Sequence, residues 1–150
     1  MSILTCTMPG QPEQQGSKRS LGPGRPMLDD NKRLKPWRAD AIAHLQQAME
    51  AQGVEQFVGP VRVSVTFVYG RPKGHYGTGR NATVVKDAAP SWKATAPDAD
   101  KLCRALGDAL TQAGVVRDDA LIVQWIAAKV WGHRPQTSLR IDDLSEISSV

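Results

Sequence analysis

Four aspartates in the second half of the chain have the residue type and spacing of metal ligands. Asp98 and Asp100 open the stretch "PDADKLCRALGDAL", and Asp118 and Asp119 follow in "RDDAL". Carboxylate oxygens are hard donors that suit Mg²⁺ or Mn²⁺, and these ions prefer sites that they share with phosphate oxygens. The four aspartates are therefore candidate ligands for an ion that acts on a phosphate-containing substrate.

The aspartate-rich stretch also has the pattern of an amphipathic helix, expected over residues 98–113. At about 100° per residue, its leucines fall on one face, while Asp100 and Arg104 fall on the opposite face. Asp98 lies at the helix start, where a carboxylate can cap free amide groups and still face outward. The pattern predicts a buried leucine stripe that consists of Leu102, Leu106 and Leu110.

Each acidic motif also has an explanation without a metal. An aspartate at a helix start is more often a cap than a ligand, and "RDD" before a strand is typical of a turn. Arg104 stands four residues from both Asp100 and Asp108, so the three could form a solvated ion network. An EF-hand is excluded because its Gly and Glu are missing, and the histidines lack the paired spacing of a zinc site.

The charge distribution favours a nucleic-acid partner. Residues 1–95 contain 13 Lys and Arg against 7 Asp and Glu, whereas residues 96–150 contain 6 against 8. A basic surface attracts phosphates, and a local acidic pocket can hold the metal that neutralises them. The candidate DNA contacts are Lys18, Arg19, Arg25, Lys32, Arg33, Lys35, Arg38, Lys73, Arg80 and Lys93.

The remaining pattern predicts an α+β chain with little regular βαβ winding. Strand "VRVSVTFVY" alternates apolar and polar residues, and Gly53 is a natural helix end. The expected elements are strands at 2–8, 60–70 and 121–131, helices at 37–53 and 98–113, and a long loop at 71–97. We expect one domain over residues 1–135, followed by a polar, flexible tail over residues 136–150.

Composition points to a water-soluble protein. Hydrophobic residues make up 41% of the chain, and its mean hydropathy is −0.35. Its apolar runs are shorter than the roughly 18 residues that a membrane span requires, and the N-terminal stretch lacks the features of a signal peptide. Cys6 and Cys103 are expected as buried free thiols. A cytoplasmic location without membrane partners is therefore expected.

The motifs, taken in order, resemble the RusA-type Holliday junction resolvases, especially phage-encoded members. The family core P-D-x-D-[N/K]-L-x-[K/R]-x-x-x-D-x-L, a D-D turn and a strand ending in a basic residue are similar to "PDADKLCRALGDAL", "GVVRDDALI" and "WIAAKVWG". Upstream, "PGQPEQQGSKR", "NKRLKPWRADAI" and "GPVRVSVTFVY" resemble the basic segment, first helix and central strand. The resemblance covers about residues 5–132.

The resemblance implies a homodimeric endonuclease with a small mixed β-sheet and two main helices packed on it. Such enzymes resolve four-way or branched DNA by paired symmetric nicks with Mg²⁺, in recombination, repair or phage DNA processing. A phage-encoded member would act in the host cytoplasm. The implied metal ligands are Asp98, Asp100 and Asp119, with Asp118 as a less critical acid nearby.

One departure concerns the catalytic basic residue, which the family places at the position of Arg104. The commonest version has Lys there and Asn directly after the second aspartate, where this chain has Lys101. Arginine stabilises phosphate charge, but its high pKa makes it a poor proton donor or acceptor. The basic role therefore falls on Arg104 through its charge alone, or is shared with Lys101.

Two other classes of function stay open on the residues. A catalytically weak or silent protein of the same fold, which binds branched DNA by its structure, would also account for the Arg104 replacement. A DxD phosphohydrolase would need a hydrophobic strand that runs straight into the first aspartate. The stretch "SWKATAP" is not such a strand, so this class ranks last.

Overall fold

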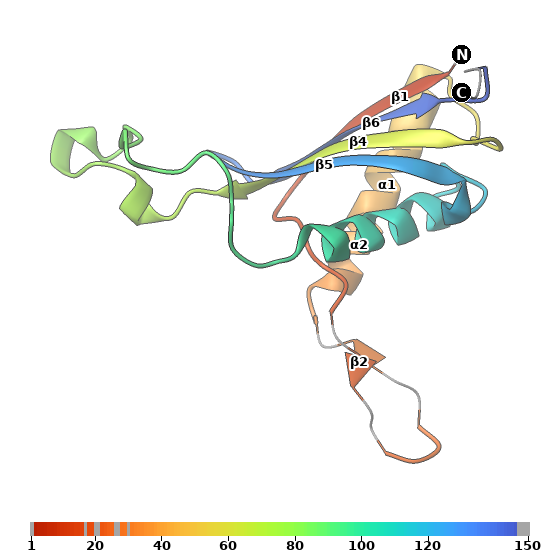
Figure 1. Cartoon of the computed structure of the whole chain (residues 1–150), viewed down its shortest axis with the longest axis horizontal. Coiled ribbons are helices and arrows are strands. Elements are labelled where there is room, and N and C mark those ends of the chain that lie inside the picture. The colour runs from red at the N-terminus through yellow and green to blue at the C-terminus, as the bar shows by residue number, and fades with distance from the viewer. Residues whose placement is uncertain (1, 17, 20–21, 26–27, 30, 147–150) are drawn as a thin grey trace.

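A four-stranded mixed sheet forms the centre of the fold, with two helices packed on one of its faces (Figure 1). The computed structural model describes residues 2–16, 18–19, 22–25, 28–29 and 31–146. The order across the sheet is β1 (Ile3–Pro9), β6 (Gln136–Asp143), β4 (Val61–Gly70) and β5 (Ile122–Gly132). Strands β4 and β5 are parallel, whereas β6 is antiparallel to both β1 and β4. The predicted α+β class is confirmed.

Strand β4 is central and shows the predicted alternation. Its buried side chains are those of Val61, Val63, Val65, Phe67 and Tyr69, and the residues between them are partly exposed. Successive side chains of a strand point to opposite faces, so one face of β4 packs on the helices. The alternation thus determines which face of the sheet becomes the core.

Helix α1 (Leu34–Gln52) begins three residues before the predicted start, and Gly53 is its C-cap, as predicted. Gly53 adopts φ 63°, a left-handed conformation that a residue without a Cβ atom adopts readily. The early start places Pro36 in the first turn of the helix. A proline is tolerated there because the amide groups of the first turn have no acceptor within the helix. Leu34 and Trp37 are both buried, so Trp37 belongs to the core.

Helix α2 (Ala99–Gln112) lies within one residue of its predicted bounds at either end. Its leucine stripe is confirmed, since Leu102, Leu106 and Leu110 are completely buried. The 3-10 helix η3 (Asp119–Leu121) then leads from α2 into β5. Within the described part of the chain, no helix has the length and apolar character needed to cross a membrane.

The tail predicted for residues 136–150 is wrong for its first eight residues, which form β6 between β1 and β4. Thr137, Leu139 and Ile141 alternate into the core, and the threonine and the charged neighbours conceal this pattern in the sequence. The partners of β6 are distant in the chain. The sheet therefore extends through Asp143, beyond the boundary predicted at 135, while residues 147–150 lie outside the described residues.

Two segments project away from the sheet (Figure 1). One contains the short antiparallel pair β2 (Lys18–Arg19) and β3 (Leu28–Asp29). The other is the loop of residues 71–97, which contains η1 (Lys73–His75) and η2 (Gly79–Asn81). Both segments carry basic residues that the sequence marks as candidate DNA contacts.

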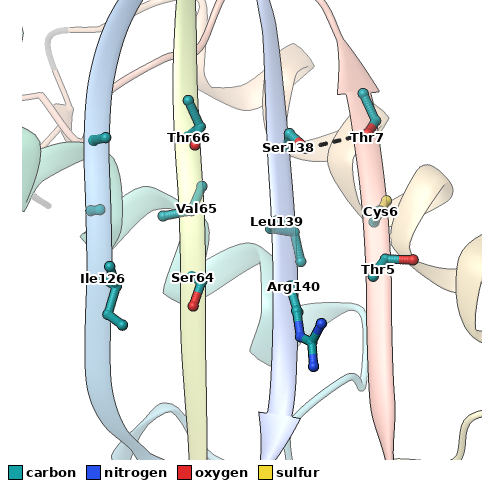
Figure 2. A pocket seen from close by; sticks show the side chains of 12 residues that line it. Thr5, Cys6, Thr7, Ser64, Val65, Thr66, Ile126, Ser138, Leu139 and Arg140 are labelled. Atoms are coloured by element: carbon teal, nitrogen blue, oxygen red, sulfur yellow. Dashed lines mark hydrogen bonds between the residues drawn. The ribbon is translucent and has the colours of Figure 1, made fainter. Parts of the chain in front are cut away.

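The face of the sheet opposite the helices carries short polar side chains (Figure 2). They border a shallow groove of about 450 Å³, and the hydroxyls of Thr7 and Ser138 lie 3.4 Å apart across β1 and β6. Antiparallel strands with one face on the core commonly expose the other face to water. This groove therefore has an ordinary structural explanation.

A buried carboxylate ties β6 to β4. Asp142 is 5% exposed; it accepts hydrogen bonds from Arg140 at 2.9–3.1 Å and lies 3.5 Å from the guanidinium of Arg62. The hydrogen bonds from Arg140, followed by its charge and that of Arg62, lower the pKa of Asp142 below its ordinary value of 3.8. The charged form of Asp142 therefore stabilises the folded sheet.

We expect Asp142→Asn to lower the free energy of unfolding by about 1–3 kcal/mol at neutral pH, because the two arginines lose a charged acceptor. The lowered pKa means that Asp142 stabilises the fold above its unfolded-state pKa and loses this effect as pH falls through the folded-state pKa. The difference between the two proteins should therefore shrink at strongly acidic pH. Urea unfolding at both pH values measures it, with exposed Asp87→Asn as the control. An equal difference at both pH values would contradict this role of Asp142.

Candidate active site

A pocket of about 410 Å³ opens between α2, η3 and β5. Two of the predicted metal ligands, Asp100 and Asp119, line it together with the predicted catalytic residue Arg104. The other lining residues are Cys103, Gly107, Ile122 and Trp125. The structure thus brings a carboxylate from the helix and a carboxylate from the following turn to one pocket, next to a guanidinium group.

The thiol in this pocket does not compete with the carboxylates for a hard cation. Burial, and then the charge of Asp100, raise the pKa of Cys103 to about 11. The thiol therefore stays protonated at neutral pH, and a protonated thiol is a poor metal ligand. The oxygen donors of Asp100 and Asp119 define the chemistry of the pocket.

Asp98 occupies the N-cap position of α2, but its side chain makes no capping hydrogen bond. Its backbone is extended (φ −71°, ψ 140°), and its carbonyl oxygen accepts the Leu102 amide at 3.2 Å. The side chain is exposed and lies outside the lining of the pocket. Because capping does not engage this carboxylate, Asp98 is available for a ligand.

Asp118 and Asp119 form a hydrogen-bonded acidic pair at η3. Asp118 accepts the Ala120 amide at 2.9 Å; this bond and the one with Asp119 lower the pKa of Asp118. The hydrogen bond with Asp118, followed by partial burial and the charges of Asp118 and Asp108, raises the pKa of Asp119. The raised pKa means that the neighbouring carboxylates disfavour the charged form of Asp119, a repulsion that a bound cation would relieve.

Arg104 and Lys101 lie in different surroundings. Arg104 is exposed and lines the acidic pocket, whereas Lys101 lines a neighbouring pocket of about 380 Å³ that also contains Glu13 and Pro97. The Lys101 carbonyl oxygen accepts the amide of Gln15 at 3.2 Å. Of the two basic candidates, Arg104 is the one that shares a pocket with the aspartates.

Asp108, which the spacing allowed to pair with Arg104 along α2, makes a contact between helices. Asp108 lies 3.8 Å from the guanidinium of Arg38 on α1, and Arg38 also donates to Gln15 at 3.4 Å. A contact between α1 and α2 therefore engages Asp108, and Arg104 lines the pocket.

The segment in front of Asp98 is held by two lysines, one of which was expected at the DNA surface. Lys93 is buried, and its ammonium group donates to Thr95 Oγ1 and to the Ala96 carbonyl, both at 2.7 Å. Burial, and then the charge of Lys129, lower the pKa of Lys93. Lys129, the basic residue at the end of "WIAAK", donates to the Thr95 carbonyl at 2.8 Å and to the Pro97 carbonyl at 2.7 Å.

The other predicted DNA contacts are mostly exposed. Arg33 forms an ion pair with Glu13 at 3.2 Å, and Arg38 is engaged by Asp108, so both are partly neutralised. The side chains of Lys18 and Arg19 lie outside the described residues. The remaining basic candidates lie at the surface of the two projecting segments and the start of α1; they are Arg25, Lys32, Lys35, Lys73 and Arg80.

The carboxylates of the pocket suit Mg²⁺ or Mn²⁺, which can complete their ligand shell with water. They do not suit a metal that takes all of its ligands from the protein. Among the described residues, no group of three His, Cys, Asp or Glu side chains could by itself hold an ion. Mg²⁺ usually binds through one or two carboxylates and completes its shell with water and substrate phosphates. Asp100 and Asp119 supply two such carboxylates, with Asp98 at the start of the same helix.

The pocket places two carboxylates beside a guanidinium group, an arrangement that suits a phosphate-containing substrate. The sequence model of the family described as "Endodeoxyribonuclease RusA" matches residues 9–142. The chain therefore belongs to the RusA endodeoxyribonuclease family, which consists of Holliday junction resolvases that hydrolyse phosphodiester bonds. No curated protein matches the chain.

We expect Asp119→Asn to raise the midpoint of thermal unfolding by at most about 2–4 °C, because it relieves repulsion from Asp118 and Asp108. Scanning calorimetry without divalent metal measures this, and the gain should shrink at high salt, which screens the repulsion. Glu55→Gln removes an exposed carboxylate elsewhere and serves as the control. A lower midpoint for Asp119→Asn would show that its charge stabilises the fold instead.

Proposed function

We propose that the chain resolves Holliday junctions by Mg²⁺-dependent hydrolysis at the pocket between α2, η3 and β5, with Mn²⁺ as an alternative ion. The observation that carries this proposal is the shared pocket of Asp100, Arg104 and Asp119. A hydrolytic site for a phosphodiester needs ligands for a cation and a fixed positive charge near the scissile phosphate. These three side chains meet both needs from two separate elements.

In this proposal, Asp100 and Asp119 hold the ion, Asp98 adds a carboxylate from the helix start, and Asp118 orients Asp119. When bound, Mg²⁺ would activate water and neutralise the charge on the phosphate oxygens. Asp118 is the less critical acid because its carboxylate already accepts the Ala120 amide at 2.9 Å. The neighbouring carboxylate of Asp118 also raises the pKa of Asp119.

Arg104 takes the basic role in this proposal, and Lys101 does not share the pocket with it. A guanidinium remains protonated through the reaction, so Arg104 acts by stabilising negative charge on the phosphate as the bond breaks. The exposed position of Arg104 leaves its donors accessible to DNA. Proton transfer is then left to water.

The DNA-binding surface in this proposal consists of the two projecting segments and the start of α1. Their exposed basic residues include Arg25, Lys32 and Lys35 on one side and Lys73 and Arg80 on the other. In the view of Figure 1, the long loop projects to the left of the sheet and the segment with β2 projects below it. Contacts from lysine and arginine to phosphates orient a protein on DNA without reading bases, which suits recognition of a branched shape.

Replacing Asp100 with Asn should reduce junction cleavage by about a hundredfold or more, because the amide keeps the shape of the side chain and loses its charge. Arg104→Met should lower kcat by about 10²–10³-fold, since it removes a donor that acts on the transition state. Lys101→Met is the matched control and should retain most of the activity. The measurement is nicking of a synthetic four-way junction in Mg²⁺, with the cut sites mapped on all strands.

Full activity of Asp100→Asn would overturn the assignment of the metal site. A Lys101→Met defect larger than that of Arg104→Met would move the basic role to Lys101. Junction binding by the wild type with no cleavage in Mg²⁺ or Mn²⁺ would contradict the proposed activity and would instead support a silent DNA-binding protein. Cuts on one strand alone would contradict paired nicking.

We further propose that the active form is a homodimer, since two symmetric cuts require two active sites and a two-fold dimer supplies them. Strand β5 is an edge of the sheet. Two of its apolar residues are exposed to solvent, Val123 at 62% and Ile126 at 54% of their full surface. An exposed apolar edge strand is a surface on which protein chains commonly pair. These residues support β5 as part of the contact between subunits.

Sedimentation at micromolar concentration should show a dimer for the wild type. Val123→Glu should weaken it, because the carboxylate would have to be buried at the contact. Val84→Glu, which changes an exposed valine of the long loop, is the control and should leave the dimer intact. A wild type that is monomeric both alone and on junction DNA would contradict the proposal.

A further inference from the structure

The segment of residues 91–97 runs along the end of β5 and leads directly into α2. The Trp131 amide donates to the Ser91 carbonyl at 2.9 Å, and the Lys93 amide donates to the Lys129 carbonyl at 3.0 Å. Trp92 forms an antiparallel bridge with Val130. The first half of the segment is therefore attached to the sheet through its backbone, while residues 95–97 have left the edge of β5.

Two ammonium groups hold the part of the segment that has left the sheet. Lys129 donates to the Thr95 carbonyl at 2.8 Å and to the Pro97 carbonyl at 2.7 Å. Lys93 donates to the Thr95 hydroxyl and to the Ala96 carbonyl, both at 2.7 Å. All four contacts fall on residues 95–97, directly before Asp98. We call Lys93 and Lys129 the lysine clamp.

The surroundings of Lys93 show that this is a built arrangement. Lys93 is 9% exposed, and its ammonium group lies 4.6 Å from the centre of the Trp131 ring and 5.1 Å from that of Tyr69. Lysines are seldom this deeply buried, because taking an ammonium group out of water is costly. The carbonyls and the aromatic faces offset that cost. A loop with no positional role would not require two such groups.

We propose that Lys93 and Lys129 are positioning residues that orient the backbone before α2, so that Asp98 and Asp100 present their carboxylates to the metal. This inference rests on the metal site of the proposed function. Fixing the Pro97 carbonyl orients the peptide between Pro97 and Asp98. With the peptide in this orientation, the backbone of Asp98 is extended and its side chain makes no capping hydrogen bond. The clamp thereby keeps the Asp98 carboxylate available for the metal.

The clamp acts through the backbone and not by touching DNA. Each ammonium group already donates to two acceptors of the protein, and Lys93 is buried. Partners that orient metal ligands usually change metal affinity or activity by about 10- to 100-fold when they are removed. A contact to phosphate would instead change the affinity for the junction and its salt dependence. The two roles therefore predict different measurements.

The test compares Lys129→Met and Lys93→Met with the wild type and with Lys86→Met, which removes an exposed lysine of the same loop. Methionine keeps an apolar stem and removes the ammonium group. Mn²⁺ binding is followed by electron paramagnetic resonance, on protein bound to a four-way junction with hydrolysis-resistant phosphorothioate linkages. Junction affinity without metal, kcat and the thermal midpoint are measured on the same proteins. Thr95→Val removes only the hydroxyl acceptor of Lys93 and tests the clamp mildly.

We expect each clamp variant to need about 10- to 100-fold more Mn²⁺ for half-saturation. The junction Kd without metal should stay within about twofold, and Lys86→Met should match the wild type. In a double-mutant cycle, Lys129→Met should add little to the loss of kcat in Asp98→Asn, because residues that act through one another are not additive. An additive loss, or wild-type Mn²⁺ binding in both clamp variants, would overturn the proposal.

The outcomes separate the clamp from the proposed function. A wild type that neither cleaves junctions nor binds Mn²⁺ would contradict the metal site itself, and the clamp with it. A wild type that does both, with unchanged clamp variants, would contradict the clamp alone. If the methionine variants do not fold, Thr95→Val decides the question: weaker Mn²⁺ binding supports the clamp, and wild-type binding overturns it.

Discussion

Burial of the α2 leucine stripe is the interaction on which the candidate active site depends. Leu102, Leu106 and Leu110 are completely buried, so α2 has one allowed rotation on the sheet. Complete burial of a leucine side chain contributes about 1.5–3 kcal/mol, and three together set the orientation of a helix of this length. That rotation directs Asp100 and Arg104 to the edge of β5, where they meet Asp119. The apolar face of the helix thus positions its polar face.

Several cations near the site are engaged by other groups, whereas Arg104 lines the pocket with the aspartates. Asp108 pairs with Arg38, and Lys93 and Lys129 donate to backbone carbonyls, so these cations do not occupy the pocket. The neighbouring carboxylate of Asp118, followed by that of Asp108, raises the pKa of Asp119, and a divalent ion would relieve this repulsion. Such repulsion costs stability in the free protein. Lower stability of the free protein is a common consequence of a site that is arranged to bind a cation.

Local patterns predicted most of the elements, and they failed where the partner of a segment was distant. The alternation in β4 and the 3.6-residue period of α2 are complete within one segment, so both were predicted to within a residue or so. Strand β6 was missed because its core positions include Thr137 and its partners β1 and β4 lie far away in the chain. Lys93 was expected at the surface because a lysine in a polar loop gives no sign of burial.

The sequence by itself determined the class of element, the leucine stripe and the identity of the acidic and basic candidates, because each depends on residue type and short-range spacing. Tertiary structure alone decided which candidates meet. It placed Asp119 beside Asp100, assigned Arg104 and Lys101 to different pockets, and turned Lys93 and Lys129 toward the backbone before Asp98. Those relations depend on how α2 packs against β5, and contacts between distant segments leave no periodic trace in the chain.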